Sequence, residues 1–212
     1  MADIVTGPGS AVAKAARDRA EEEGLGLAEK RVASEEIFRG RMLHIFNDTV
    51  ELPNGMPASR EVIRHVGAVA VLPLTGDGQA VVERQFRYPV GKVITEIPAG
   101  KLNSSDEDRL EAAKRELREE TGITADEWTD MGEFIPAAAY CDEKLTLYLA
   151  RGLHYGPRDL DDDEFLNVET VPFGELVDDV MNGRIVDAKT QTAVLKAACL
   201  TGYFAKGSGD GR

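Results

Sequence analysis

The sequence has few of the residues that build disulfide frameworks and zinc sites. Only two of its 212 residues are cysteine, Cys141 and Cys199, and only three are histidine. Two cysteines do not make a disulfide framework, and the scattered His44, His65 and His154 lack the paired spacing of zinc ligands. The composition therefore gives no indication of a secreted disulfide scaffold or of a zinc-binding module.

Long hydrophobic runs are also missing. No apolar stretch approaches the roughly 20 residues that are needed to cross a bilayer. The first residues lack the apolar core of a secretory signal. We therefore expect a cytoplasmic protein with no membrane partner.

Positive charge is scarce. Lysine and arginine together number 25, against 38 aspartates and glutamates, so the formal net charge is −13. Nucleic-acid binding needs a basic surface, so this balance argues against a nucleic-acid partner. It is compatible with a small phosphorylated ligand, because a few arginines or one metal ion can bind such a ligand locally.

The chain falls into four parts of different character. Residues 1–29 combine loop-like sequence with SAVAKAARDRAEEE, which is rich in helix formers and charge, and we expect a partly helical or disordered extension. Residues 30–66 contain three extended segments and a PNG turn, which predicts a β arm. Residues 67–205 hold the main domain, and we expect residues 206–212 to be disordered.

The main domain mixes strand and helix patterns. GAVAVLPL, QAVVERQF and VITEI are typical of strands, and PAGK of a loop. A helix is expected from Asp106 to Thr121, capped by Ser105 and closed by Gly122. Further strands and helices are expected at residues 128–135, 144–150, 164–171, 173–182 and 187–204. Because strands and helices do not alternate regularly, the order predicts an α+β fold, an α/β/α sandwich with a mixed sheet.

The expected helix ends in RELREETGI, residues 115–123, where three glutamates share one face. Glu116, Glu119 and Glu120 stand at i, i+3 and i+4, about 5–6 Å apart at Cβ, where like charges repel. One interpretation is a solvated acidic face, and we expect Glu120 to be exposed. The other is a divalent cation, because the helix dipole disfavours acids in the last turns and because PAGK and another acid, Glu96, come just before. Carboxylates and a backbone carbonyl suit Mg²⁺.

Gly100, Glu107 and RELREETGI resemble the signature box of Nudix hydrolases, G-x5-E-x7-R-E-U-x-E-E-x-G-U with U aliphatic. Six residues rather than five separate Gly100 from Glu107, and one extra loop residue costs little. Outside the box, GAVAVLPL, QFRYP, TEIPAGKL, CDE at 141–143 and DAKT at 187–190 are similar to segments of the ADP-ribose pyrophosphatases of that family. The resemblance runs from about residue 30 to residue 203. It implies a Nudix-type sandwich with an N-terminal antiparallel strand arm.

The resemblance implies a role for each box residue. The metal ligands would be Ala99 through its carbonyl, Glu116, Glu119 and Glu120. Arg115 would orient the glutamates, in agreement with its i+4 reach to Glu119, and Glu107 would brace the loop. The expected cofactor is Mg²⁺, with Mn²⁺ as a substitute.

The resemblance also implies residues outside the box. Glu143, or with less support Asp142, would supply a catalytic acid from the loop PAAAYCDE, in which Ala138 and Ala139 replace the Pro-Gly of the subfamily. The residues implied near the substrate are Arg87, Arg60, Glu61, Glu96 and Phe38. ADP-ribose pyrophosphatases are generally homodimers that exchange N-terminal strands, which implies that residues 30–66 serve in dimerisation.

The implied activity is Mg²⁺-dependent hydrolysis of ADP-ribose, a small-molecule nucleotide sugar, to AMP and ribose 5-phosphate. A second interpretation is another nucleotide-sugar diphosphatase, acting on GDP-mannose or UDP-sugars. A third is a non-catalytic ADP-ribose sensor. Such sensors usually lose box acids, and this chain keeps all of them.

Overall fold

The structure is a computed structural model that describes residue 24, residues 26–160 and residues 164–206. The expected partly helical extension and the expected disordered tail therefore lie almost entirely outside the described residues. The chain divides into two compact units, Met1–Arg64 and His65–Arg212. No helix among the described residues is both long enough and apolar enough to cross a membrane.

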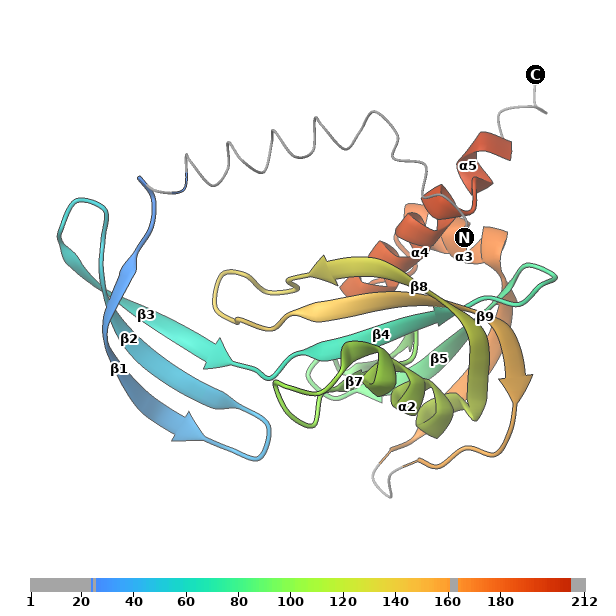
Figure 1. The fold of residues 1–212 in the computed structure, drawn as a ribbon, viewed down its shortest axis with the longest axis horizontal. Helices are drawn as coiled ribbons and strands as arrows, with labels where there is room; N and C mark the ends of the chain where they lie inside the picture. Colours follow the sequence, from blue (N-terminus) through green and yellow to red (C-terminus); the bar gives the residue numbers. More distant parts are fainter. Residues whose placement is uncertain (1–23, 25, 161–163, 207–212) are drawn as a thin grey trace. The chain divides into compact units, whose positions relative to one another are not determined.

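The first unit is an antiparallel sheet of three strands in the order β1-β2-β3 (Figure 1). The strands are β1 (Lys30–Arg39), β2 (His44–Glu51) and β3 (Pro57–Arg64). The turn between β2 and β3 contains Gly55 at φ 80°. Every residue of β1 is exposed within this unit. The predicted N-terminal strand arm is confirmed.

The second unit contains a mixed sheet of four strands in the order β7-β4-β9-β8. These are β4 (Ala68–Pro73), β7 (Ala99–Lys101), β8 (Ile123–Phe134) and β9 (Leu145–Tyr155). β4 pairs with β9 in parallel, whereas the pairs β4–β7 and β8–β9 are antiparallel. A second, antiparallel sheet has the order β10-β5-β6, from β5 (Gln79–Arg87), β6 (Lys92–Glu96) and β10 (Leu166–Pro172).

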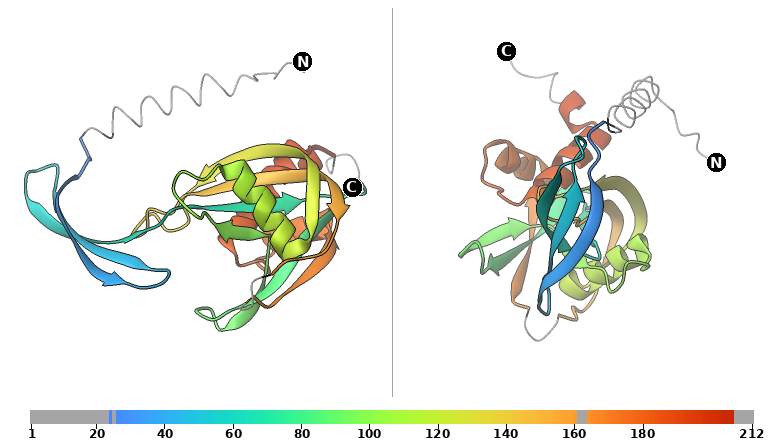
Figure 2. Two further views of the ribbon diagram at one scale, coloured as in Figure 1. Left: turned by 60° about the horizontal axis from the view of Figure 1, so that its bottom comes forward. Right: turned by 90° about the vertical axis from the view of Figure 1, so that its left-hand side faces the viewer.

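Helices cover both faces of the four-stranded sheet. They are α2 (Arg109–Thr121), α3 (Phe173–Met181), α4 (Ala188–Leu200) and the short α5 (Tyr203–Lys206). Successive side chains of a strand point to opposite faces, so Val69 and Val71 of β4 pack with α2 while Ala70 and Leu72 pack with α3 and α4. Figures 1 and 2 show α2 on one side of the sheet and α3 and α4 on the other. The predicted α+β sandwich with a mixed sheet is confirmed.

Three local predictions are wrong. The helix cap is Asp108, whose carboxylate accepts from the N–H groups of Leu110 and Glu111, so α2 begins three residues later than expected and Ser105 lies in the preceding loop. Part of the segment predicted as a loop, Ala99–Lys101, is strand β7, because it pairs with the edge of β4. Strand β8 begins directly after α2 rather than at residue 128.

Candidate active site

The glutamates of RELREETGI lie in the second half of α2, where the helix packs against the four-stranded sheet. Side-chain exposure is 29% for Glu119 and 12% for Glu116, and Glu120 is buried. The expectation that Glu120 lies on an exposed face is therefore wrong. The face is not a solvated acidic surface, because β7 and β4 cover the side of the helix that carries Glu120.

Arg115 is the cation at the centre of these acids. One terminal nitrogen, Nη1, lies 2.7 Å from Oε1 of Glu116 and 3.1 Å from Oε2 of Glu119. The other, Nη2, lies 3.4 Å from Oε1 of Glu107. The predicted i+4 contact between Arg115 and Glu119 is confirmed. Glu107 also accepts from the backbone N–H of Asn103 at 2.5 Å, so its carboxylate links the loop to the helix.

The backbone of β7 approaches the acids closely. The N–H of Ala99 donates to Oε2 of Glu120 at 2.9 Å. A Cβ on Gly100 would lie only 1.9 Å from Cδ of Glu116. Glycine at position 100 is therefore needed for the Glu116 carboxylate to lie against the strand.

A second group of charges comes from the β5–β6 pair. Glu83 and Glu96 stand opposite each other in the strand register, and both are buried. Oε2 of Glu96 accepts from Nε of Arg87 at 2.7 Å, and the Arg87 side chain is 42% exposed. Oε1 of Glu83 is buried without a hydrogen-bond partner among the described residues. A buried carboxylate oxygen without a donor is costly and therefore marks a place that favours a proton or a cation.

The two groups form one electrostatic cluster. Burial, with further contributions from Glu83 and Glu116, raises the pKa of the Glu120 carboxyl to about 10. Burial, together with the neighbouring Glu96, raises the pKa of Glu83 to about 8. Burial also raises the pKa of Glu116, although Arg115 opposes the rise. The site therefore holds more carboxyl groups than its own cations can keep ionised at neutral pH.

Two members of this cluster were missed by the sequence analysis. Glu83 interrupts the apolar strand segment QAVVERQF, and an acid at such a position is a signal that could have been used. Glu164 adds a charge that raises the pKa values of Glu83, Glu116 and Glu120, although it is far away in the sequence. No local pattern marks Glu164.

The expected catalytic acid from the later loop has different neighbours. Oε1 of Glu143 lies 3.6 Å from Nδ1 of His65, a nitrogen that also accepts from the backbone N–H of Gly67. Asp142 accepts from the backbone N–H of His65 at 2.7 Å. The loop itself turns at Ala137, whose carbonyl accepts from Tyr140 and Cys141.

Three of the implied substrate residues belong to the first unit. Arg60 pairs with Glu29, and Glu61 stands opposite Asn47 in the register of β2 and β3. Phe38 is 52% exposed on β1. Within their unit these side chains are accessible. Arg87 and Glu96 lie in the second unit with the carboxylate cluster.

The donor chemistry fits a hard divalent cation. The cluster offers carboxylate oxygens, the Ala99 backbone lies at its edge, and one buried oxygen of Glu83 has no partner among the described residues. As the side chains stand, no three His, Cys, Asp or Glu residues in the described ranges are grouped tightly enough to hold a metal ion. In this arrangement Arg115 contacts Glu116 and Glu119, and Glu120 accepts from the Ala99 N–H.

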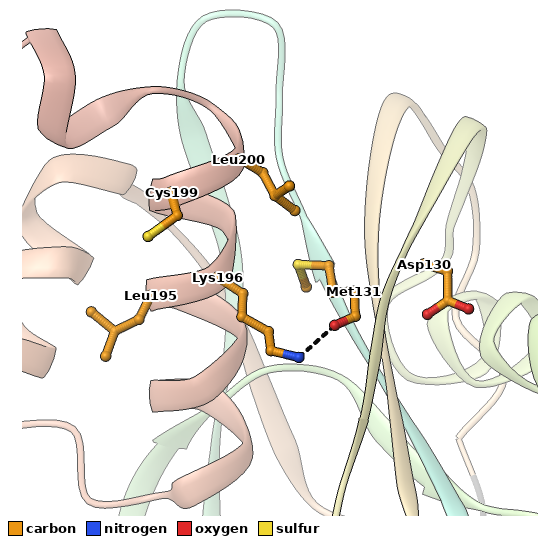
Figure 3. Close-up of a pocket in the computed structure, with 6 residues that line it drawn as sticks. All are labelled: Asp130, Met131, Leu195, Lys196, Cys199 and Leu200. Atoms are coloured by element: carbon orange, nitrogen blue, oxygen red, sulfur yellow. Dashed lines mark hydrogen bonds between the residues drawn. The ribbon is translucent and has the colours of Figure 1, made fainter. Parts of the chain in front are cut away.

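A separate cavity of about 460 Å³ lies between α4 and β8 (Figure 3). Its lining is mainly apolar and includes Met131 and Leu195. Lys196 crosses it to donate to the Met131 carbonyl at 2.5 Å. None of the candidate site residues lines this cavity.

Comparisons with known proteins agree with the box and the fold. The model of the NUDIX domain matches residues 64–190. An ADP-ribose pyrophosphatase of Bacillus subtilis (strain 168) is 41% identical over 170 residues, which is 79% of this chain and 91% of the relative. A methanol dehydrogenase activator of Bacillus methanolicus is 40% identical over 168 residues, 78% of this chain and 90% of the relative. A crystal structure of an ADP compounds hydrolase has a TM-score of 0.71 at 22% identity and covers 85% of this chain and 96% of that chain.

Proposed function

The chain belongs to the NUDIX domain family, and we propose that it hydrolyses the diphosphate bond of ADP-ribose to give AMP and ribose 5-phosphate. The observation that carries the proposal is the buried carboxylate cluster of α2 against the Ala99–Gly100 backbone, in a chain 41% identical to an ADP-ribose pyrophosphatase. Such a cluster suits a reaction in which the negative charge of a diphosphate must be neutralised and a water molecule activated.

We assign a divalent cation, Mg²⁺ or Mn²⁺, to this cluster. The oxygen donors would be those of Ala99, Glu116, Glu119 and Glu120. A bound ion supplies charge neutralisation at the diphosphate and acidifies water. Arg115 contacts both Glu116 and Glu119 and so restrains their side chains beside the place assigned to the ion.

The substrate diphosphate would be bound by Arg87. Its side chain is 42% exposed, and its Nε is held by the buried Glu96. An arginine anchored at one end and open at the other can donate two parallel hydrogen bonds to phosphate oxygens. Glu96 would thus contribute to substrate binding indirectly, by holding Arg87 in place.

Two acids are candidates for taking the proton of the attacking water, Glu143 and Glu164. The charge of Glu164 acts on Glu83, Glu116 and Glu120, whereas Glu143 is next to His65. This charge makes Glu164 a second candidate beside the cluster, and the family resemblance favours Glu143. Kinetic comparison of Glu143→Gln with Glu164→Gln identifies the base. Substitution of the residue that acts as the base should lower kcat on the order of 100-fold, whereas the other variant should retain most of the wild-type kcat.

We also propose that the protein is a homodimer assembled through the β1–β3 sheet. This unit exposes several large apolar side chains: Val32, Ile37 and Phe38 on β1, and Met42 and Met56 in the connections between the strands. Surfaces of this kind mark interaction sites. Phe38, Arg60 and Glu61 of one copy would then line the nucleotide site of the other.

The test is a substrate panel with purified full-length protein and Mg²⁺. It contains ADP-ribose, ADP-glucose, GDP-mannose, UDP-glucose and NAD⁺, which carries an ADP-ribose moiety, and release of nucleoside monophosphate is followed by chromatography. ADP-ribose is expected to give the highest kcat/KM, and Glu120→Gln is the inactive control. If kcat/KM is higher for GDP-mannose or UDP-glucose, that nucleotide sugar and not ADP-ribose is the preferred substrate. Tight binding without hydrolysis would make the protein a sensor.

A further inference from the structure

The segment DAKT, residues 187–190, starts α4 and contacts the end of β6. Asp187 caps the helix, accepting from both the backbone N–H and the hydroxyl of Thr190. The same hydroxyl oxygen accepts from the N–H of Ile97 at 3.0 Å. Because Thr190 is fully buried, this contact fixes the start of α4 against the chain just after Glu96.

Lys189 adds a charged contact at the same place. Its Nζ lies 2.5 Å from Oε1 of Glu96 and 3.1 Å from Oδ1 of Asp187. Its side chain is 12% exposed and that of Glu96 is 5% exposed. A buried ammonium between two carboxylates is well compensated, so Lys189 is held in place.

The two oxygens of Glu96 therefore have different partners. Oε1 is taken by Lys189 and Oε2 by Nε of Arg87. Arginine and a carboxylate otherwise tend to form a bidentate pair, in which two guanidinium nitrogens face two oxygens. With Oε1 occupied, Arg87 contacts Glu96 through Nε alone among the described residues. Its two terminal nitrogens then stay available for another anion.

We propose that Lys189 is a positioning residue for the substrate diphosphate: by holding Oε1 of Glu96 it prevents a bidentate Arg87–Glu96 pair and keeps the terminal nitrogens of Arg87 free. This inference rests on the proposed function, since it takes Arg87 as the residue that binds the diphosphate. Lys189 itself does not touch the substrate. It acts only through Glu96 and Arg87.

The first experiment compares Lys189→Met with the wild type in ADP-ribose hydrolysis. Without the ammonium, Oε1 becomes available to Arg87, and we expect KM to rise on the order of tenfold while kcat changes by less than about threefold. The dissociation constant of the non-hydrolysable α,β-methylene analogue should rise by the same factor. Lys189→Arg, which restores a cation, should recover most of the affinity. An unchanged KM, or a fall in kcat at constant KM, would overturn the proposal.

The matched control is Lys196→Met. Lys196 lies on the same helix and is also partly buried, but it donates to the Met131 carbonyl, away from Glu96. Loss of a lysine from α4 should by itself leave KM unchanged. If both variants raise KM equally, the effect comes from general loosening of α4 and the proposal fails.

The second experiment separates positioning from direct contact. In an Arg87→Met background, Lys189→Met should have no further effect on KM, because Lys189 works only through Arg87. If the effects of the two substitutions on KM instead multiply, Lys189 acts independently of Arg87 and the proposal is wrong. Should Lys189→Met not fold, Lys189→Gln asks the same question with a polar side chain, since it also removes the ammonium that holds Oε1 of Glu96. It should raise KM as Lys189→Met would, and an unchanged KM would refute the proposal.

The outcomes for the two proposals are distinguishable. If the wild type hydrolyses no nucleoside diphosphate and does not bind the methylene analogue, the proposed function fails. If the wild type is active and Arg87→Met raises KM while Lys189→Met does not, the function stands and the inference on Lys189 falls.

Discussion

At the scale of single residues, burial decides what the acids of this site can do. Glu120 is buried beside Glu83 and Glu116, and its carboxylate is held by one backbone N–H, that of Ala99. A carboxyl in this environment is proton-bound at neutral pH unless a cation is present. A cation bound by Glu120 would therefore displace this proton, so that metal affinity would depend on pH.

Glu120→Gln should abolish activity and leave the fold intact. The amide keeps the shape and an oxygen for the Ala99 N–H, but it loses the charge that binds the cation. We expect kcat to fall by on the order of 100-fold or more with saturating Mg²⁺, and the melting temperature in EDTA to be no lower than that of the wild type. Activity within tenfold of the wild type would exclude Glu120 as a ligand.

Stability without metal should depend on pH through Glu83 and Glu120. Their folded pKa values, about 8 and about 10, are raised above the unfolded value of about 4.3, so the native state holds more protons between these limits. The stability that these two carboxyls contribute is fully present below about pH 4.3. It is lost as the pH rises through their folded pKa values, about 8 and about 10. In EDTA, the melting temperature of the wild type should fall more between pH 5 and pH 8 than that of the Glu83→Gln/Glu120→Gln double variant. Parallel curves would contradict this assignment.

At the scale of elements, the end of α2 is fixed by a close backbone crossing. Gly122 ends the helix at φ 73°, and its carbonyl accepts from the N–H of Gly156 at 2.7 Å. A Cβ on Gly122 would lie 2.2 Å from the carbonyl oxygen of Gly156. Just beyond, the N–H of Asp159 donates to the carbonyl of Glu119. The chain after β9 is thus attached to the helix turn that carries Glu119 and Glu120.

Gly122→Ala should therefore be strongly destabilising, by about 2–4 kcal/mol, because strain and a backbone clash add. Gly183→Ala is the matched control. Gly183 has nearly the same φ, 71°, but nothing lies within 4 Å of a Cβ there, so only the left-handed strain of about 1–2 kcal/mol remains. Chemical denaturation of both variants measures the difference. Equal losses would show that the crossing contributes nothing.

At the scale of the whole molecule, the chain has two compact units of different composition. The family model covers residues 64–190 and so coincides mostly with the second unit, which contains the carboxylate cluster. The first unit offers exposed apolar side chains and the three residues Phe38, Arg60 and Glu61. Residues 1–26 precede both the family match and the strand arm.

Deleting residues 1–26 should leave turnover and assembly nearly unchanged. This segment shows no apolar stripe matched to the sheet and lies outside the family resemblance. The measurements are kcat/KM for ADP-ribose and the molar mass from light scattering, for full-length and truncated protein side by side. A truncated protein with a lower oligomeric state than the full-length protein would show that the segment takes part in assembly.

Much of the fold and part of the site could be predicted from the sequence. The box residues Arg115, Glu116, Glu119 and Glu120 stand within six positions, and helical spacing alone places them together. The strands were found from apolar runs and turn residues, and their order indicated a mixed sheet. These features depend on neighbours a few residues away, so a pattern in the sequence is enough to show them.

Tertiary structure alone decided the rest. Glu120 is buried because β7, about twenty residues earlier in the sequence, covers it. The sequence pattern of the helix alone does not predict this burial. Glu83 joins the site from strand β5, Glu164 from the loop before β10 and Lys189 from α4, while Glu143 lies beside His65. The sequence by itself determined which acids share the helix face. The tertiary structure determines which other charged groups lie near these acids. The reason is that burial and electrostatic coupling depend on distance in space rather than on separation along the chain.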